Sequence, residues 1–157
     1  GSIEVDVLNK GMGLLLQHAL GGSSGPTAQG GTAAYLQTFE TNDVGPATSY
    51  TVQVGKADSN GGLQSFTYEG SVVTGWNISA DLGSAVSMTF NFDSEAEQNS
   101  TALAAASYPS GSDVFVYTDC TIELDDSAVN SFTSFSLDAD LGMATSRRFL
   151  KLSLIHI

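Results

Sequence analysis

Few side chains in this chain are suited to chemistry. The 157 residues include two histidines and one cysteine, whereas a nucleophile or general base needs partners in a convergent arrangement. His18 is expected on the polar side of a helix, and Cys120 alternates with Ile122 and Leu124 as a small buried apolar side chain would. We therefore predict neither an enzyme nor a cofactor site, and a lone cysteine provides no pair to hold a structural zinc.

Carboxylates are the one abundant chemical group, with seventeen Asp and Glu residues. Glu123, Asp125 and Asp126 could hold a cation, although acids around an exposed turn are more often simply solvated. No pair of carboxylates is singled out by spacing, so a carboxylate-based hydrolase remains only the weakest alternative. The sequence predicts no metal site.

The charge of the chain limits its partners. The formal net charge is −12, and Lys10 and Lys56 are the only basic residues before Arg147, whereas all the acids precede it. Duplex DNA carries dense negative charge, so such a surface repels it, although a repelling wall suits a passive conduit. No apolar run approaches the roughly 20 residues that cross a bilayer. We predict no specific nucleic-acid binding and no membrane partner.

The elements that must position these side chains are mostly strands, since Gly, Ser and Thr are abundant and alternation is common. A strand is expected from Ser2 to about Leu8. An apolar stripe predicts one helix over residues 10–20, with Asn9 as its N-cap and Gly21 as its stop. The glycine-rich residues 21–33 are expected to form a mobile loop. Further antiparallel strands are expected at 35–41, 50–56, 63–69, 76–82 and 86–92, with a hairpin turn at 58–62.

The second half of the chain begins after an irregular stretch. Residues 94–112 break the alternation and contain Pro109, so they are predicted to connect two units. Strands are expected at 114–124 and 130–141. The expected division is a first β unit at 1–93, the connection at 94–112, the start of a second, similar unit at 113–148, and a tail at 149–157 that resembles translated adapter read-through. Further protein sequence is expected to be missing at each end.

An internal similarity supports two units. Trp76–Gly83 recurs 59 positions later as Phe135–Gly142, and both copies begin with an aromatic residue and end in Ala-Asp-Leu-Gly. A partial duplication explains this similarity, and chance resemblance between two alternating strands is the alternative. The alternation also predicts the core, which is expected to contain Leu16, Trp76, Ile78, Leu82, Phe90, Phe92, Cys120, Ile122, Phe135, Leu137 and Leu141.

Several segments carry a resemblance to a known family. Gly1–Val7, Gly11–Leu16 and Phe66–Trp76, in this order, resemble the major tail tube proteins of long-tailed bacteriophages, and Tyr117–Asp125 followed by Phe135–Gly142 is similar to the later part of the same family. The resemblance covers residues 1 to 148. It implies a mainly β fold, an antiparallel β-sandwich or barrel with one short flanking helix, in a structural virion protein.

The same resemblance implies how the protein works. Subunits of this family form rings, commonly hexameric, which stack into a tube that double-stranded DNA passes without specific binding. Such a subunit contacts itself and other tail proteins, and it is assembled in the host bacterial cytoplasm. Mobile segments are then expected to order on a neighbouring ring. The residues expected to mediate assembly are Gly22, Ser23, Gly25, Pro26, Gly30, Gly31, Glu95, Tyr108, Arg147 and Arg148.

An extracellular β-sandwich that binds carbohydrate or another protein is the main alternative. Its obvious aromatic contacts would be Trp76, Tyr108 and Tyr117. Trp76 belongs to the inward-facing set of its strand, however, and this position favours a role in the core.

Overall fold

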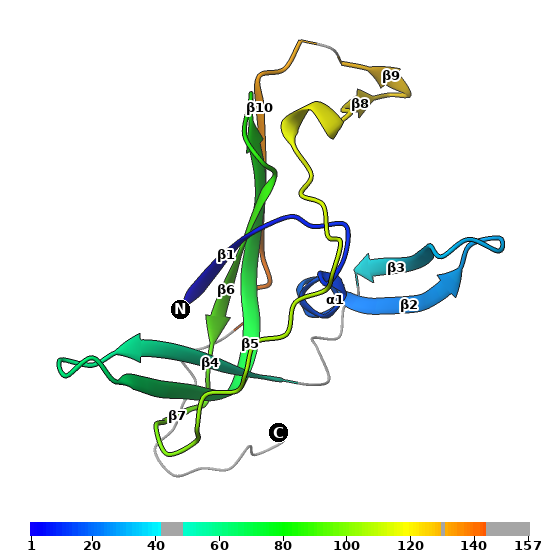
Figure 1. Cartoon of the computed structure of the whole chain (residues 1–157). Coiled ribbons are helices and arrows are strands. Elements are labelled where there is room, and N and C mark those ends of the chain that lie inside the picture. The colour runs from blue at the N-terminus through cyan, green and yellow to red at the C-terminus, as the bar shows by residue number, and fades with distance from the viewer. Residues whose placement is uncertain (42–48, 130, 144–157) are drawn as a thin grey trace, which may run out of the picture.

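The fold is built on a four-stranded antiparallel path with one helix against it. A computed structural model describes residues 1–41, 49–129 and 131–143. The strands β1 (Ser2–Asp6), β6 (Ser87–Asp93), β5 (Leu63–Asp81) and β10 (Ser134–Asp140) lie side by side in the order β1-β6-β5-β10 (Figure 1). The described residues thus form a mainly β, sandwich-like protein with one α-helix and without a closed barrel, which confirms the predicted fold class.

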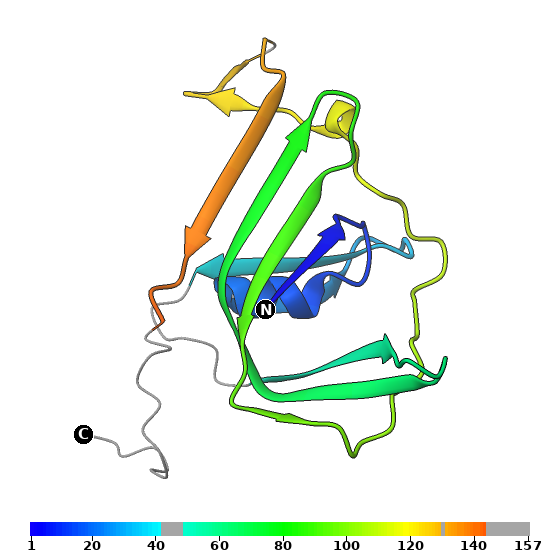
Figure 2. The same ribbon diagram turned by 90° about the vertical axis from the view of Figure 1, so that its left-hand side faces the viewer.

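The longest strand, β5, joins two sets of strands. Its first part pairs with β4 (Tyr50–Ala57) and β7 (Ala96–Gln98), and its second part pairs with β6 and β10. Two separate strands at 63–69 and 76–82 were expected, and this expectation is wrong. Gly70, with φ +63°, and a register shift between Val73 and Gly75 bend the strand instead of ending it (Figure 2).

The helix α1 (Gly13–Leu20) covers one side of this sheet (Figure 2). Its N-cap is Met12 rather than the expected Asn9, and it ends as predicted at Gly21, which adopts a left-handed conformation with φ +91°. Apolar side chains from the helix and the sheet meet there. The buried core consists of Met12, Ala19, Val73, Met88, Phe90 and Phe92.

His18 lies on a buried side of α1, which corrects its expected exposure. Only 5% of the residue is exposed, and its ring stacks on that of Tyr50 with 3.8 Å between centroids. The Tyr50 hydroxyl donates a hydrogen bond to the Leu14 carbonyl, so β4 closes over the side of the helix that sequence alone left open to solvent. Burial lowers the pKa of His18 and raises the pKa of Tyr50 to about 12.

The buried His18 predicts a loss of stability in mild acid. Its pKa is 6.5 when unperturbed and lower in the folded chain, so the unfolded chain binds more protons as the pH falls below 6.5. The free energy of unfolding should therefore fall from about pH 7.5 to about pH 5, as urea denaturation can measure. A His18→Gln variant should lose this part of the pH dependence, and identical profiles for the two proteins would contradict the prediction.

Residues 21–33 are not simply a loop. Gly21–Ala28 form β2, which pairs antiparallel with β3 (Tyr35–Thr41), and the hairpin projects away from α1 (Figure 1). The expected mobile loop is wrong here because a ladder of backbone hydrogen bonds needs no apolar side chains. Gly25 is required at the register shift, since its φ is +96° and a Cβ there would lie 2.8 Å from the Leu36 carbonyl oxygen.

The second half contains less regular structure than expected. The predicted strand at 114–124 is replaced by isolated bridges from Leu8 to Val114 and from Ala85 to Val116, a 3-10 turn at Tyr117–Asp119, and β8 (Glu123–Leu124). These residues find single bridging partners rather than a continuous neighbouring strand, so no longer ladder forms. Asp125 and Asp126 form the turn between β8 and β9 (Ser127–Ala128) with positive φ, and the expected connection at 94–112 contains β7.

The predicted core residues fall into three groups. Phe90 and Phe92 are buried, and Leu16, Trp76 and Ile78 are partly buried against the same core. Cys120, Ile122 and Phe135 are half-buried. The expectation that Leu82, Leu137 and Leu141 lie in the core is corrected, because all three are exposed. Leu82 lies in a turn, and Leu137 and Leu141 lie on and beyond β10, the outermost strand, away from the cover of α1.

The hairpin turn at 58–62 is present as predicted. The Asp58 carboxylate accepts hydrogen bonds from the backbone N–H groups of Asn60, at 2.7 Å, and Gly62, at 2.8 Å. Gly61 has φ +79°, which is the left-handed conformation that this turn needs. None of the described residues forms a helix with the length and apolarity that a bilayer-spanning segment requires.

Candidate assembly surfaces

One face of the four-stranded path carries only polar residues and glycine. Successive side chains of a strand point to opposite faces, and residues paired across strands share a face. One such row runs through Glu4, Thr89, Asn77 and Asp138. We call this the polar sheet face, and it consists of Ser2, Glu4, Asp6, Gly75, Asn77, Ser79, Asp81, Ser87, Thr89, Asn91, Ser134, Ser136, Asp138 and Asp140.

The opposite face is apolar. The row through Val5, Met88, Ile78 and Leu137 lies on it, and Met88 belongs to the core beneath α1. The helix therefore covers the apolar face and leaves the polar sheet face uncovered, with the strands in front of α1 in Figure 2. The alternation that predicted the core also contained this signal, because the polar positions between core residues define the second face.

The polar sheet face is acidic and ordered by its own hydrogen bonds. It carries five carboxylates and no Lys or Arg. The Asn77 side-chain amide donates to Ser136 Oγ at 2.9 Å and to Asp138 Oδ1 at 2.7 Å, while Ser136 Oγ donates to Asp138 Oδ2 at 3.2 Å. These contacts tie β5 to β10. A face of this composition repels polyanions and offers no cationic group to bind them.

The β2–β3 hairpin forms a second surface, with apolar side chains in solvent. Tyr35 is 68% exposed and Leu36 is 55% exposed, and both lie at the start of β3 near the tip. The sequence predicted the glycines and Pro26 of this region for assembly and did not point to these two residues. As consecutive strand residues they point to opposite faces of the hairpin, so each face of the projecting arm offers one exposed apolar side chain to another molecule.

The other predicted assembly residues are scattered. Gly22, Ser23, Gly25 and Pro26 lie within β2, and Gly30 and Gly31 lie in the turn that follows it. Glu95 lies beside Gly70 at the bend of β5, and Tyr108 is exposed in the connection. Arg147 and Arg148 lie outside the described residues.

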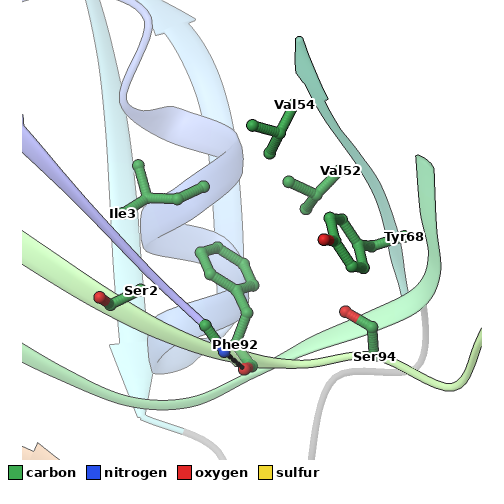
Figure 3. A pocket seen from close by; sticks show the side chains of 8 residues that line it. Ser2, Ile3, Val52, Val54, Tyr68, Phe92 and Ser94 are labelled. Atoms are coloured by element: carbon green, nitrogen blue, oxygen red, sulfur yellow. Dashed lines mark hydrogen bonds between the residues drawn. The ribbon is translucent and has the colours of Figure 1, made fainter. Parts of the chain in front are cut away.

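No catalytic arrangement is visible among the described residues. They contain no group of three or more His, Cys, Asp or Glu side chains that could hold a metal, and Glu123, Asp125 and Asp126 are exposed around the β8–β9 turn. A cavity of about 300 Å³ lies between β1 and the β4–β5 hairpin (Figure 3). Its lining is mostly apolar and includes Ile3, Val52, Val54, Tyr68 and Phe92. Ser2, Ser94 and Gly1 complete the lining, which contains no Asp, Glu, His or Cys that could activate a serine hydroxyl.

The three aromatic residues expected of a ligand-binding module do not share one role. Trp76 packs against the core, and the Tyr117 hydroxyl donates a hydrogen bond to the Phe132 carbonyl. Tyr108 alone among the three is strongly exposed. This arrangement does not favour an aromatic binding surface.

Comparison with known protein families identifies a match. A family model described as phage tail tube protein matches residues 1–153 of the chain. No curated protein matches the chain.

Proposed function

The chain belongs to the phage tail tube protein family, and we propose that copies of it assemble into stacked rings that enclose a channel for DNA. Proteins of this family are structural components of the virion tail, and the family is not a known enzyme family. Assembly in the cytoplasm of the bacterial host and contacts with other tail proteins are parts of the same proposal. We also propose that the chain is divided into a first unit at 1–93 and the start of a second unit at 113–148.

The polar sheet face carries this proposal. We infer that it faces the channel, because it is acidic, has no basic residue and is held in place by side-chain hydrogen bonds. DNA phosphates are repelled by such a wall, so the duplex slides without being bound. The opposite face cannot take this role, because α1 and the core cover it.

The two outer strands of the sheet supply the contacts within a ring. β1 and β10 each have one edge whose backbone groups no strand of the described residues pairs. A ring closes when β1 of one copy lies beside β10 of the next, since this contact joins two different surfaces. The projecting β2–β3 hairpin, with Tyr35 and Leu36 exposed, then contacts a copy in the adjacent ring.

Electron microscopy tests assembly directly. The complete gene product that contains this chain should form rings or tubes in negative stain at high concentration. Particles that remain single subunits under all conditions of salt and concentration would contradict the proposal.

Lysine substitutions test which face lines the channel. Glu4→Lys with Asn91→Lys adds three positive charges to the polar sheet face, and Glu40→Lys with Asn60→Lys adds the same charge elsewhere on exposed residues. Tubes of the first variant should retain duplex DNA that nuclease cannot reach, and this retention should fall steeply with added salt. Tubes of the second variant should protect no DNA. Equal protection in the two variants would contradict the placement of the polar sheet face.

A further inference from the structure

The pairing of β5 with β10 has a local twofold symmetry inside one chain. The internal similarity extends to Thr74–Gly83 and Thr133–Gly142, which share Thr, Ala, Asp, Leu and Gly at equivalent positions. In the observed register Ile78 lies opposite Leu137, which is its own equivalent in the second segment. The two segments are therefore related by an axis through this central pair.

The pairs on either side of the axis obey the same symmetry. Trp76 lies opposite Ala139, and Ala80 lies opposite Phe135, so an aromatic residue faces alanine in both pairs. Each member of one pair is the equivalent of a member of the other pair. The register also keeps the alternation of the two segments in phase. The apolar side chains of both segments therefore lie on the apolar face, and their polar side chains lie on the polar sheet face.

Backbone hydrogen bonds at the two ends repeat the symmetry. The Leu141 N–H donates to the Thr74 carbonyl at 3.0 Å, and the Leu82 N–H donates to the Thr133 carbonyl at 2.9 Å. These bonds join the same residue types at equivalent positions. Gly83 and Gly142, which follow the two leucines, both have positive φ. β10 thus offers β5 the same backbone partners and the same pattern of side chains as a second β5 would.

We propose that the edge of β5 is self-complementary and that β10 acts as an internal cap on it. When β10 leaves, two copies of the chain pair through β5 about a twofold axis, with Ile78 of one copy opposite Ile78 of the other. Each Leu82 N–H then donates to the Thr74 carbonyl of the other copy. The apolar faces of the two sheets lie on the same side, so the paired sheets are continuous.

Two features keep β10 in place within a single chain. It is tethered to β5, so its effective concentration is far higher than that of a second molecule. The contacts of the Asn77 amide with Ser136 and Asp138 are also specific to β10, because the equivalent residues of β5 are Asn77 and Ser79. β10 is nevertheless held mainly by β5, the strand with which it makes its extensive contact. Leu137, at the centre of β10, is 57% exposed.

The cap determines which assembly is available. A pair formed through β5 is isologous and closes on itself, whereas a ring needs a head-to-tail contact between different edges. By covering β5, β10 removes the closed dimer and leaves β1 and β10 as the outer strands. The benefit for ring formation rests on the proposed function, but the self-complementarity of β5 does not.

A proline in β10 tests the proposal. Leu137→Pro removes a backbone N–H from the centre of the β5–β10 ladder without altering β5. The mass by light scattering should double from the 16.3 kDa of the single chain. Leu137→Ala keeps the N–H and should not form this dimer. A folded, monomeric Leu137→Pro chain at high concentration would overturn the proposal, whereas a protein with β10 in place that forms no rings would overturn only the ring model.

Two further variants identify the contact. A Cβ at Gly75 would lie 2.8 Å from the Ala139 carbonyl oxygen and, by the symmetry, equally close to the Ala80 carbonyl of the other copy. Adding Gly75→Ala to Leu137→Pro should therefore abolish the dimer. In a Cys120→Ala background, Ile78→Cys with Leu137→Pro should give a disulfide-linked dimer upon oxidation. A dimer that persists with Gly75→Ala, or that never crosslinks, would exclude pairing through β5.

A gentler variant covers the case in which the proline prevents folding. Ser136→Ala with Asp138→Ala removes the contacts to Asn77, and both side chains are exposed, so the core is untouched. This variant should form the same dimer at a lower concentration than the wild-type chain. An unchanged concentration dependence would overturn the proposal.

Discussion

Replacing Phe90 with alanine is expected to lower the free energy of unfolding by about 3–5 kcal/mol. Phe90 is fully buried, lies between Ile3 and Trp76 across its neighbouring strands, and belongs to the core under α1. Its removal leaves a cavity bounded by the sheet on one side and the helix on the other. The expected loss is a large part of the roughly 5–15 kcal/mol that stabilises a typical domain. Denaturation in guanidinium chloride measures it.

Phe115→Ala is the matched control for this prediction. Phe115 is 44% exposed, and its contacts to Val7 and Val86 are backbone hydrogen bonds that alanine keeps. The free energy of unfolding should change by less than about 1 kcal/mol. Equal losses for the two variants would mean that the stability of the chain does not depend on the core between α1 and β6.

Deleting residues 22–32 from the complete gene product is expected to leave a folded subunit that no longer forms tubes. The deletion removes most of β2 and the turn after it, and no deleted residue belongs to the buried core or packs against it. The projecting arm that carries Tyr35 and Leu36 is lost, and with it the contact that we propose between rings. Circular dichroism should show the remaining β structure, and electron micrographs should show no tubes.

A smaller change separates the apolar contact from the arm itself. Tyr35→Ser with Leu36→Ser keeps the backbone of the hairpin and removes only its exposed apolar side chains. Tube length should fall sharply, whereas Gln29→Ala, at the end of β2 beyond the ladder, should have little effect. Unchanged tubes in the deletion variant would refute the assembly role of this region.

The sequence predicted those elements whose signals are local. Alternation predicted β1, β3, β4, β6 and β10 close to their observed bounds. A strand with one buried face can be recognised from the alternation of its own apolar and polar residues. Asp58 and the Asn60-Gly61 dipeptide predicted the hairpin turn, and Gly21 predicted the end of the helix. Each of these features depends on backbone geometry that neighbouring residues determine.

Elements whose formation depends on a partner segment were misjudged. β2 consists of Gly, Ser, Pro, Thr and Ala, and it forms because β3 supplies the other half of its hydrogen-bonded ladder. Residues 114–124 alternate well but meet only isolated bridging partners. Pairing is a property of two segments, so composition and period within one segment do not decide it.

Composition and alternation by themselves determined that this chain is acidic, mainly β and poor in catalytic groups. These properties follow from the number of each residue type and from the spacing of apolar residues along the chain. Tertiary structure alone decided that His18 is buried, that Leu137 is exposed, and that the duplicated segments pair with each other as neighbouring strands. The physical reason is that burial and pairing depend on which surfaces meet in space. Tyr50 closing over α1, and the register that sets Ile78 opposite Leu137, are contacts between residues far apart in the chain.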